Sequence, residues 1–154
     1  MSIVSDIEKL KKEKNAVILA HYYVDEDVQD IADYIGDSFY LSKVATKVDQ
    51  DRIIFAGVEF MGESAKILNP DKRVFMPDMN ADCPMAHMAD KEEILKLREE
   101  YDDLAFVCYI NSTAELKKYS DVCVTSSNAV KIVKNLPNKN IFFIPDRNLG
   151  HFVA

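Results

Sequence analysis

The stretch "VILAHYYVDEDVQDIADYIGDS", residues 17–38, decides the fold. Its apolar run stops abruptly at His21, which predicts a buried strand that ends there. An acidic segment follows, with apolar residues at helical i, i+3, i+4 and i+7 spacing: Val28, Ile31, Ala32 and Ile35. The spacing predicts a helix with one buried stripe. A strand followed by such a helix is the opening of a βαβ unit.

The same alternation continues along the chain. Short runs rich in Val, Ile and Phe predict strands near residues 16–20, 53–57, 73–76, 104–109, 122–124 and 141–144. Segments of helical period separate most of these runs. This order is typical of parallel sheets with helices on their faces, and the sequence therefore predicts an α/β fold.

An internal similarity indicates a duplication. The segment "KILNPDKRVFMPDMN", residues 66–80, aligns with "KNLPNKNIFFIPDRN", residues 134–148, so that Pro-Asp-x-Asn recurs 68 positions later. Turn chemistry alone explains either copy. Because the copies share their spacing, we favour a repeated βαβαβ module. The predicted modules cover residues 1–85 and 86–154.

Composition restricts the classes of function. The 154 residues are 48% hydrophobic and carry a formal net charge of −7, which argues against a nucleic-acid partner. The sequence contains no apolar run of membrane-spanning length and no secretory leader at its start, so we expect no membrane association and a cytoplasmic location. Three cysteines without a CxxC pair fit a reducing compartment.

Polar side chains follow two of the predicted strands. His21 and Tyr23 come after the first strand, and Tyr109 and Asn111 come after the fourth. Each residue taken alone is readily explained as structural. Since parallel sheets bind ligands outside the carboxyl ends of their strands, the recurrence favours a shared pocket.

Serines mark two predicted helix starts, Ser38 in "GDSFYLS" and Ser126 in "VTSSNAV". The N–H groups of a helix N-terminus bind carboxylate or phosphate, although simple capping explains serine there equally well. For Ser112 and Glu115 we expect only a capping box. Two such anion niches would suit a small polyanionic metabolite.

Cys83 is the one cysteine predicted to lie at the carboxyl edge of a sheet, and its residue type leaves packing, nucleophilic and metal-binding roles open. His87 and His151 do not complete a zinc site with it, because a zinc site needs several ligands at short spacing. Cys108 and Cys123 lie within predicted strands, where a free cysteine usually behaves as a small apolar residue.

Several strings resemble the quinolinate synthase family over essentially the whole chain. They are "AHYYVDEDVQDIADYIGDSFYLS", "IIFAGVEFMGESAKILNPDKRVFMPD", "CPMAHMAD", "YINSTAELK", "VTSSNAVKIV" and "IPDRNLGHFVA", in that order. The resemblance implies three similar α/β modules around a pseudo-threefold axis, of which this chain would hold two. It also implies a [4Fe–4S] cluster at the centre, acting as a Lewis acid.

The implied activity is that of a transferase of pyridine nucleotide biosynthesis. It condenses iminoaspartate with dihydroxyacetone phosphate, giving quinolinate, phosphate and water on the route to NAD. The resemblance assigns proton transfer and substrate orientation to His21 and Tyr23. It gives Tyr109 a catalytic role in positioning the intermediate near the cluster, and substrate contacts to Asn111, Ser38 and Ser126. Cys83 matches the first of three cysteines that bind the cluster.

The third module and two cluster cysteines would lie beyond Ala154. The resemblance therefore implies a fragment or split enzyme that needs a complementing C-terminal polypeptide, and an enzyme that supplies iminoaspartate. We expect this chain alone to be inactive. The alternative is a non-catalytic α/β module or partner subunit that binds a small molecule or phosphate.

Overall fold

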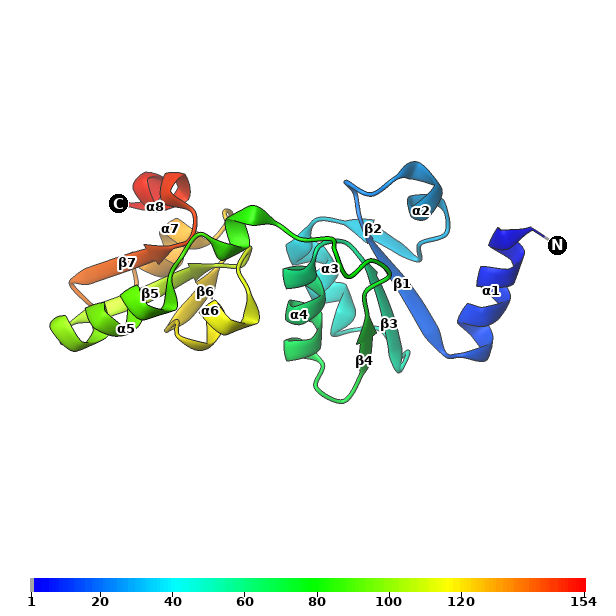
Figure 1. The fold of residues 1–154 in the computed structure, drawn as a ribbon, viewed down its shortest axis with the longest axis horizontal. Coiled ribbons are helices and arrows are strands. Elements are labelled where there is room, and N and C mark those ends of the chain that lie inside the picture. Colours follow the sequence, from blue (N-terminus) through cyan, green and yellow to red (C-terminus); the bar gives the residue numbers. More distant parts are fainter. Residues whose placement is uncertain (1) are drawn as a thin grey trace. The chain divides into compact units, whose positions relative to one another are not determined.

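Two parallel sheets with flanking helices organise the chain (Figure 1), which confirms the predicted α/β class. The structure is a computed structural model that describes residues 2–154. It forms two compact units, the first ending at Asp82 and the second running from Cys83 to Ala154. Cys83 therefore begins the second unit, whereas the sequence placed it at the end of the first.

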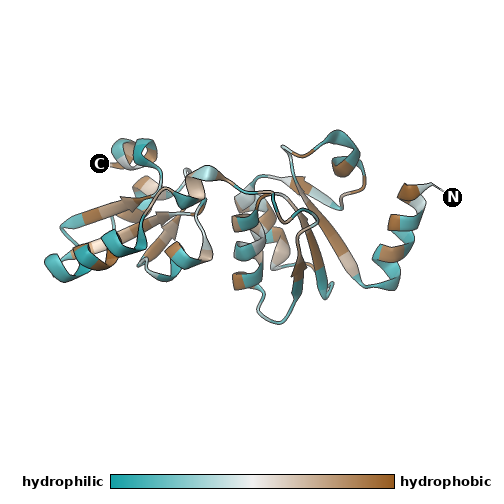
Figure 2. Cartoon of the chain, viewed as in Figure 1, coloured by the Kyte–Doolittle hydropathy of each residue, from teal (hydrophilic) through white to brown (hydrophobic). Residues whose placement is uncertain are grey.

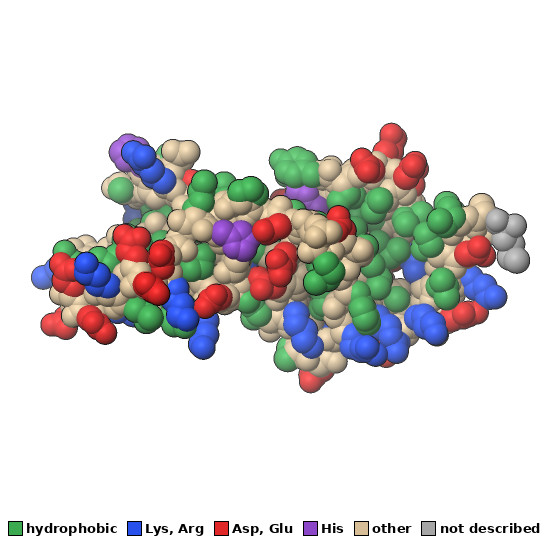
Figure 3. Space-filling view, in the orientation of Figure 1, with side chains coloured by type: hydrophobic (Ala, Val, Ile, Leu, Met, Phe, Trp, Pro, Cys, Tyr) green, Lys and Arg blue, Asp and Glu red, His purple; other side chains and the backbone are tan. Residues whose placement is uncertain are grey.

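The first unit holds a four-stranded sheet with the strand order β2-β1-β3-β4. Its elements are α1 (Ile3–Glu13), β1 (Ala16–His21), α2 (Glu26–Asp30), β2 (Tyr34–Gly36), α3 (Ser38–Ala45), β3 (Arg52–Ala56), α4 (Glu59–Leu68) and β4 (Arg73–Phe75). Residues 17–21 of β1 are all buried, as expected for a parallel strand that is covered on both faces. Figure 2 shows the central strands as strongly hydrophobic, and Figure 3 shows acidic side chains gathered over α2.

The second unit holds a three-stranded sheet with the order β6-β5-β7. Its elements are a 3₁₀ helix η1 (Pro84–His87), α5 (Lys91–Glu100), β5 (Leu104–Tyr109), α6 (Ala114–Lys118), β6 (Val122–Val124), α7 (Ala129–Val133), β7 (Asn140–Ile144) and α8 (Arg147–Val153). Two apolar clusters form its core. One is built around Phe106 and Ile94, and the other around Val107 and Val124.

The helix predicted from the Val28–Ile35 spacing is much shorter than expected. Helix α2 ends at Asp30, and Ile35 lies in strand β2, which the sequence analysis missed. The reason is pairing with β1, where Ala20 and Ile35 are register partners. Strand pairing therefore outweighs the local helical pattern. The predicted apolar stripe is divided between helix α2, which contains Val28, and strand β2, which contains Ile35.

The repeat is real, but its spacing is 88 residues rather than 68. The 68-residue alignment superimposes β4 on β7, yet β4 is an edge strand next to β3 while β7 pairs with the central strand β5. Strand β3 pairs with β1 as β7 pairs with β5, and Arg52 and Asn140 begin these strands 88 positions apart. The matched Pro-Asp turns therefore follow strands with different positions in their sheets.

An aspartate makes the same pair of hydrogen bonds in both units. Asp33 accepts the Ile18 N–H through its side chain at 2.8 Å, and its own N–H donates to the Ile18 carbonyl at 2.9 Å. Asp121 repeats this with Phe106, at 2.7 Å and 2.9 Å. The residues are again 88 positions apart, and the bonds tie the start of each edge strand to the central strand.

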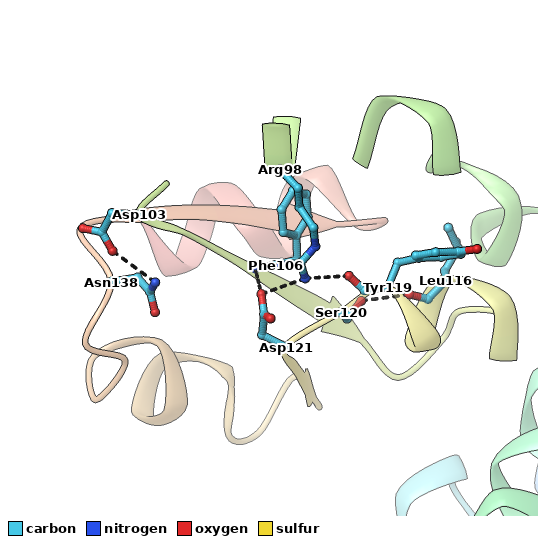
Figure 4. Close-up of polar contacts among 8 residues, drawn as sticks. All are labelled: Arg98, Asp103, Phe106, Leu116, Tyr119, Ser120, Asp121 and Asn138. Atoms are coloured by element: carbon cyan, nitrogen blue, oxygen red, sulfur yellow. Dashed lines mark hydrogen bonds and ion pairs between the residues drawn. The ribbon is translucent and has the colours of Figure 1, made fainter. Parts of the chain in front are cut away.

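A basic side chain from the helix that precedes each central strand binds the same aspartate. Lys11 Nζ of α1 lies 2.8 Å from Asp33 Oδ1. Arg98 of α5 lies 3.0 Å from Asp121 Oδ2 and stacks over the Phe106 ring at 4.4 Å from its centroid (Figure 4). Burial acts to lower the pKa of Lys11, but its hydrogen bonds to Asp33 and Glu8 outweigh this effect and raise it above 10.5.

Within residues 2–154, no helix is both long enough and apolar enough to span a bilayer.

We predict that Asp121→Ala lowers the free energy of unfolding of the second unit by about 1–3 kcal/mol, because the buried Phe106 N–H loses its acceptor. Urea denaturation followed by far-UV circular dichroism measures the change. The exposed α5 residue Glu99 provides the control, and Glu99→Ala should change stability by less than about 0.5 kcal/mol. Equal stabilities for the two variants would contradict a structural role for Asp121.

Candidate functional site

In the first unit, the predicted site residues lie at the carboxyl edge of the sheet. His21 is the last residue of β1, and its register partner Gly36 is the last residue of β2. The Tyr22 N–H donates to the Gly36 carbonyl at 3.2 Å, so the two chain segments continue side by side beyond the strands. This pairing places His21 and Tyr23 beside the turn that leads to Ser38.

His21 is held within an aromatic group. It is only 7% exposed, its ring stacks on Tyr22 at 4.6 Å between centroids, and Tyr23 meets it edge-on at 4.7 Å. The Tyr23 N–H donates to His21 Nδ1 at 3.3 Å. This bond assigns the imidazole proton to Nε2 in the neutral ring, which therefore offers a donor there.

The charge state of His21 follows from its surroundings. Burial lowers its pKa below the ordinary 6.5, and the Asp37 carboxylate opposes the shift. The ring is therefore neutral at pH 7. The sequence analysis overlooked Asp37, although the "GDS" motif that contains it preceded a predicted helix.

Ser38 is the first residue of α3, as predicted, but Asp37 caps the helix. The Asp37 carboxylate accepts the Tyr40 N–H at 2.7 Å, which satisfies one of the N–H groups at the helix start. An anion at Ser38 would therefore lie next to a negative charge. The niche is suited to a ligand that also presents a hydrogen-bond donor.

In the second unit, the equivalent edge carries Tyr109 and Asn111. Tyr109 ends β5 opposite Val124, which ends β6, and the Ile110 N–H donates to the Val124 carbonyl at 2.8 Å. The fully buried Ser112 donates its hydroxyl to the Tyr109 carbonyl at 2.7 Å. This bond fixes the turn that carries Asn111. Thr113, rather than Ser112, caps α6, so the predicted capping box is absent from this turn.

The side-chain oxygen of Asn111 has no hydrogen-bond partner. Oδ1 is buried, and in the part of the chain that the structure describes it is the one buried side-chain nitrogen or oxygen atom in this condition. Leaving such an atom unpaired costs about 1–3 kcal/mol, and folded proteins rarely tolerate it without a reason. A ligand that donates to Oδ1 would supply the missing bond.

Ser126 does not start a helix, contrary to the prediction. It is exposed in the turn after β6, and α7 begins three residues later with Asn128 as its N-cap. Asn128 Oδ1 accepts the Thr125 N–H at 2.7 Å, and the hydroxyls of Thr125 and Ser127 lie 2.9 Å apart. Side-chain hydrogen bonds thus shape a turn where helical N–H groups were expected. Ser126 nevertheless shares its sheet edge with Tyr109.

The two edges correspond residue by residue. His21, Tyr23 and Ser38 in the first unit precede Tyr109, Asn111 and Ser126 in the second by 88 positions each, the spacing of the structural repeat. The structure therefore brings the predicted residues together within each unit, at equivalent strand ends.

Cys83 is partly exposed and precedes η1, with its carbonyl accepting the Ala86 N–H at 2.9 Å. Cys108 is buried in β5 as predicted, but Cys123 on β6 is exposed. None of the three is in a disulfide. Among the described residues, no three His, Cys, Asp or Glu side chains are grouped to hold a metal ion.

Comparison with known proteins shows which family this chain is similar to. The family described as "Quinolinate synthetase A protein" matches residues 5–154. Quinolinate synthase of Fusobacterium nucleatum is 66% identical over 148 residues, which are 96% of this chain and 50% of that protein. Those of Caldicellulosiruptor saccharolyticus and Pyrococcus abyssi are 56% and 57% identical, with 98% and 100% of this chain covered.

The chain spans about half the length of these curated relatives, with shares of 50% to 52%. The match begins ahead of the first strand and continues through both sheets to Ala154. By this coverage and identity, the chain belongs to the quinolinate synthetase A family.

Proposed function

We propose that this chain forms the part of a quinolinate synthase that binds substrate at two equivalent sheet edges. The reaction is the condensation of iminoaspartate with dihydroxyacetone phosphate to quinolinate, phosphate and water, in the biosynthesis of NAD. Membership of the family and the names of the relatives support the assignment. The observation that carries it is the unpaired, buried Asn111 Oδ1 at the edge of the second sheet.

The residues of the first unit are suited to holding a polar substrate. His21 offers its Nε2–H to a carbonyl, carboxylate or phosphate oxygen, since Nδ1 already accepts the Tyr23 N–H. Donation from Nε2 orients the substrate and polarises the oxygen that accepts it, and proton transfer by the ring requires the proton to move to Nδ1 so that Nε2 can accept. Tyr23 is 81% exposed, and its hydroxyl can orient the substrate from the open side.

The second unit supplies matching contacts. Asn111 Oδ1 accepts from an imine, amine or hydroxyl donor, and these are groups that iminoaspartate or dihydroxyacetone phosphate can present. Tyr109, the last residue of β5 before this turn, helps to position the reacting intermediate. Ser38 and Ser126 provide hydroxyls for the carboxylates and phosphate, although neither is backed by a free helix N-terminus of the kind expected from the sequence.

A [4Fe–4S] cluster does not fit this chain alone. Such clusters are held mainly by cysteine thiolates, and the described residues group no three metal-binding side chains. Cys108 and Cys123 are register partners on β5 and β6. In the proposal, Cys83 gives one thiolate and the remaining ligands come from a complementing C-terminal polypeptide.

The proposed partners are the two substrates, the complementing polypeptide and an enzyme that supplies iminoaspartate. The proposal includes a cytoplasmic site of action and no nucleic-acid or membrane partner.

A second candidate function is a non-catalytic subunit that binds a small molecule or phosphate. One observation favours it: the buried Asn111 Oδ1, which has no partner, suits a bound ligand whether or not a reaction follows. In that case the sheet edges bind ligand without turnover.

Anaerobic reconstitution separates the two functions. The chain is mixed with a polypeptide covering the second half of the Fusobacterium nucleatum relative, iron and sulfide. We predict bound iron, broad visible absorption and quinolinate formation, with all three lost in Cys83→Ala and kept in Cys123→Ser. Full iron content and activity in Cys83→Ala would contradict the assignment. Binding of dihydroxyacetone phosphate without iron or product would favour the non-catalytic subunit.

Asn111 gives a prediction that separates binding from stability. In the same mixture, Asn111→Ala should lower kcat/KM by about 10- to 100-fold, since a hydrogen bond to a charged ligand contributes about 1.5–3 kcal/mol. Its free energy of unfolding should not fall, because Oδ1 has no partner in the protein to lose.

Asn128→Ala is the matched control. Its Oδ1 accepts the Thr125 N–H, so this variant should lose about 1 kcal/mol of stability. An Asn111→Ala chain that is destabilised as much as Asn128→Ala and retains full kcat/KM would show that Asn111 is structural.

A further inference from the structure

Two cysteines lie side by side in the second unit. Cys108 on β5 and Cys123 on β6 are register partners in a parallel pair, so their side chains leave the same face of the sheet. Neighbouring strands are about 4.8 Å apart, which falls within the range of about 4.4–6.8 Å between the Cα atoms of a disulfide. At this spacing the two sulfurs can come within bonding reach of each other.

The two thiols differ in their access to solvent. Cys108 is 0% exposed and packs with Phe106, Leu116 and Ile144. Cys123 is exposed on β6, which is the edge strand of the sheet. A dissolved oxidant can therefore reach Cys123, while Cys108 stays protected directly behind it.

The surroundings also favour one thiolate in the pair. The hydrogen bond from Cys123 lowers the pKa of Cys108 to about 6 against the effect of burial, and the positive charge of Lys117 adds to the lowering. The pKa of Cys123 is raised, chiefly by the same hydrogen bond. At neutral pH the two sulfurs therefore share one proton, which is held mainly by Cys123. That proton can move to the Cys108 thiolate when Cys123 reacts.

We propose that Cys108 and Cys123 form a redox-active dithiol, a modification site that hydroperoxides convert into a disulfide across β5 and β6. Cys123 passes its proton to the Cys108 thiolate as its sulfur attacks a peroxide oxygen, the O–O bond breaks, and an alcohol or water leaves. The Cys108 sulfur then attacks the sulfenic sulfur of Cys123 and releases water. In total the two thiols lose two protons and two electrons. The hydroperoxide is reduced to an alcohol, or to water in the case of hydrogen peroxide, with release of one further water.

The geometry makes the modification reversible and local. A spacing of about 4.8 Å lies near the short end of the disulfide range, and strained bridges are readily reduced by thiols. In its protonated form, Cys108 Sγ also donates to the carbonyl of Tyr109 at 3.4 Å. Bridging to β6 removes that hydrogen bond one residue before the turn that carries Asn111.

Thiol mapping of the whole chain tests the proposal. The reduced protein is treated with hydrogen peroxide, alkylated after unfolding and digested with trypsin, which separates the two cysteines at Lys117 and Lys118. We expect alkylation of Cys108 and Cys123 to fall together, a linked peptide to form, and dithiothreitol to restore both. The linked peptide should form equally in Cys83→Ser.

The variant Cys123→Ser keeps the buried Cys108 in place and changes only an exposed atom, so it should fold. In this variant Cys108 should remain fully alkylatable after peroxide treatment. The proposal is wrong if the native chain keeps Cys108 alkylatable while Cys123 is oxidised to sulfinic or sulfonic acid. It is also wrong if bridges involve Cys83, or if peroxide leaves both thiols unchanged.

Discussion

A side-chain carboxylate that completes the hydrogen bonding of a central strand underlies both units. Asp33 and Asp121 each bond to the N–H and carbonyl of one strand residue, Ile18 or Phe106, and each binds a cation from the preceding helix. The bonds fix where the edge strand begins. Because parallel strands run in register from that point, they also fix where the strands end, and so where the site residues lie.

The equivalence of the two sheet edges also follows from these aspartate hydrogen bonds. In each unit the equivalent aspartate fixes where the edge strand begins. The chain segment that follows the edge strand therefore lies at the same position beside the central strand. Ser38 and Ser126 follow those edge strands, and His21 and Tyr109 end the central strands. The two edges then differ in chemistry rather than position. One presents a neutral imidazole stacked on tyrosine, and the other presents an amide oxygen that lacks a partner.

The sequence was sufficient for most strands because each is a short apolar run between turn residues, and the site residues were found because they follow those runs directly. Strand β2 was missed since its pairing with β1 is a tertiary contact, and its Ile35 completed a helical pattern by coincidence. The 68-residue alignment followed Pro-Asp turns, whereas the 88-residue repeat is expressed in hydrogen bonds that share few identical residues. The Asn111 oxygen could not be foreseen, because burial without a partner is a property of the folded turn.

The central claim is that the carboxyl edges of the two sheets bind the substrate. The most direct measurement is an NMR titration of the ¹⁵N-labelled chain with dihydroxyacetone phosphate. The account predicts that shifts concentrate at the side-chain amide of Asn111 and at the backbone of Tyr22, Tyr23, Ser38 and Ser126. Shifts confined to the opposite ends of the strands, near Asn15 and Asp103, or no shifts at millimolar ligand, would contradict it.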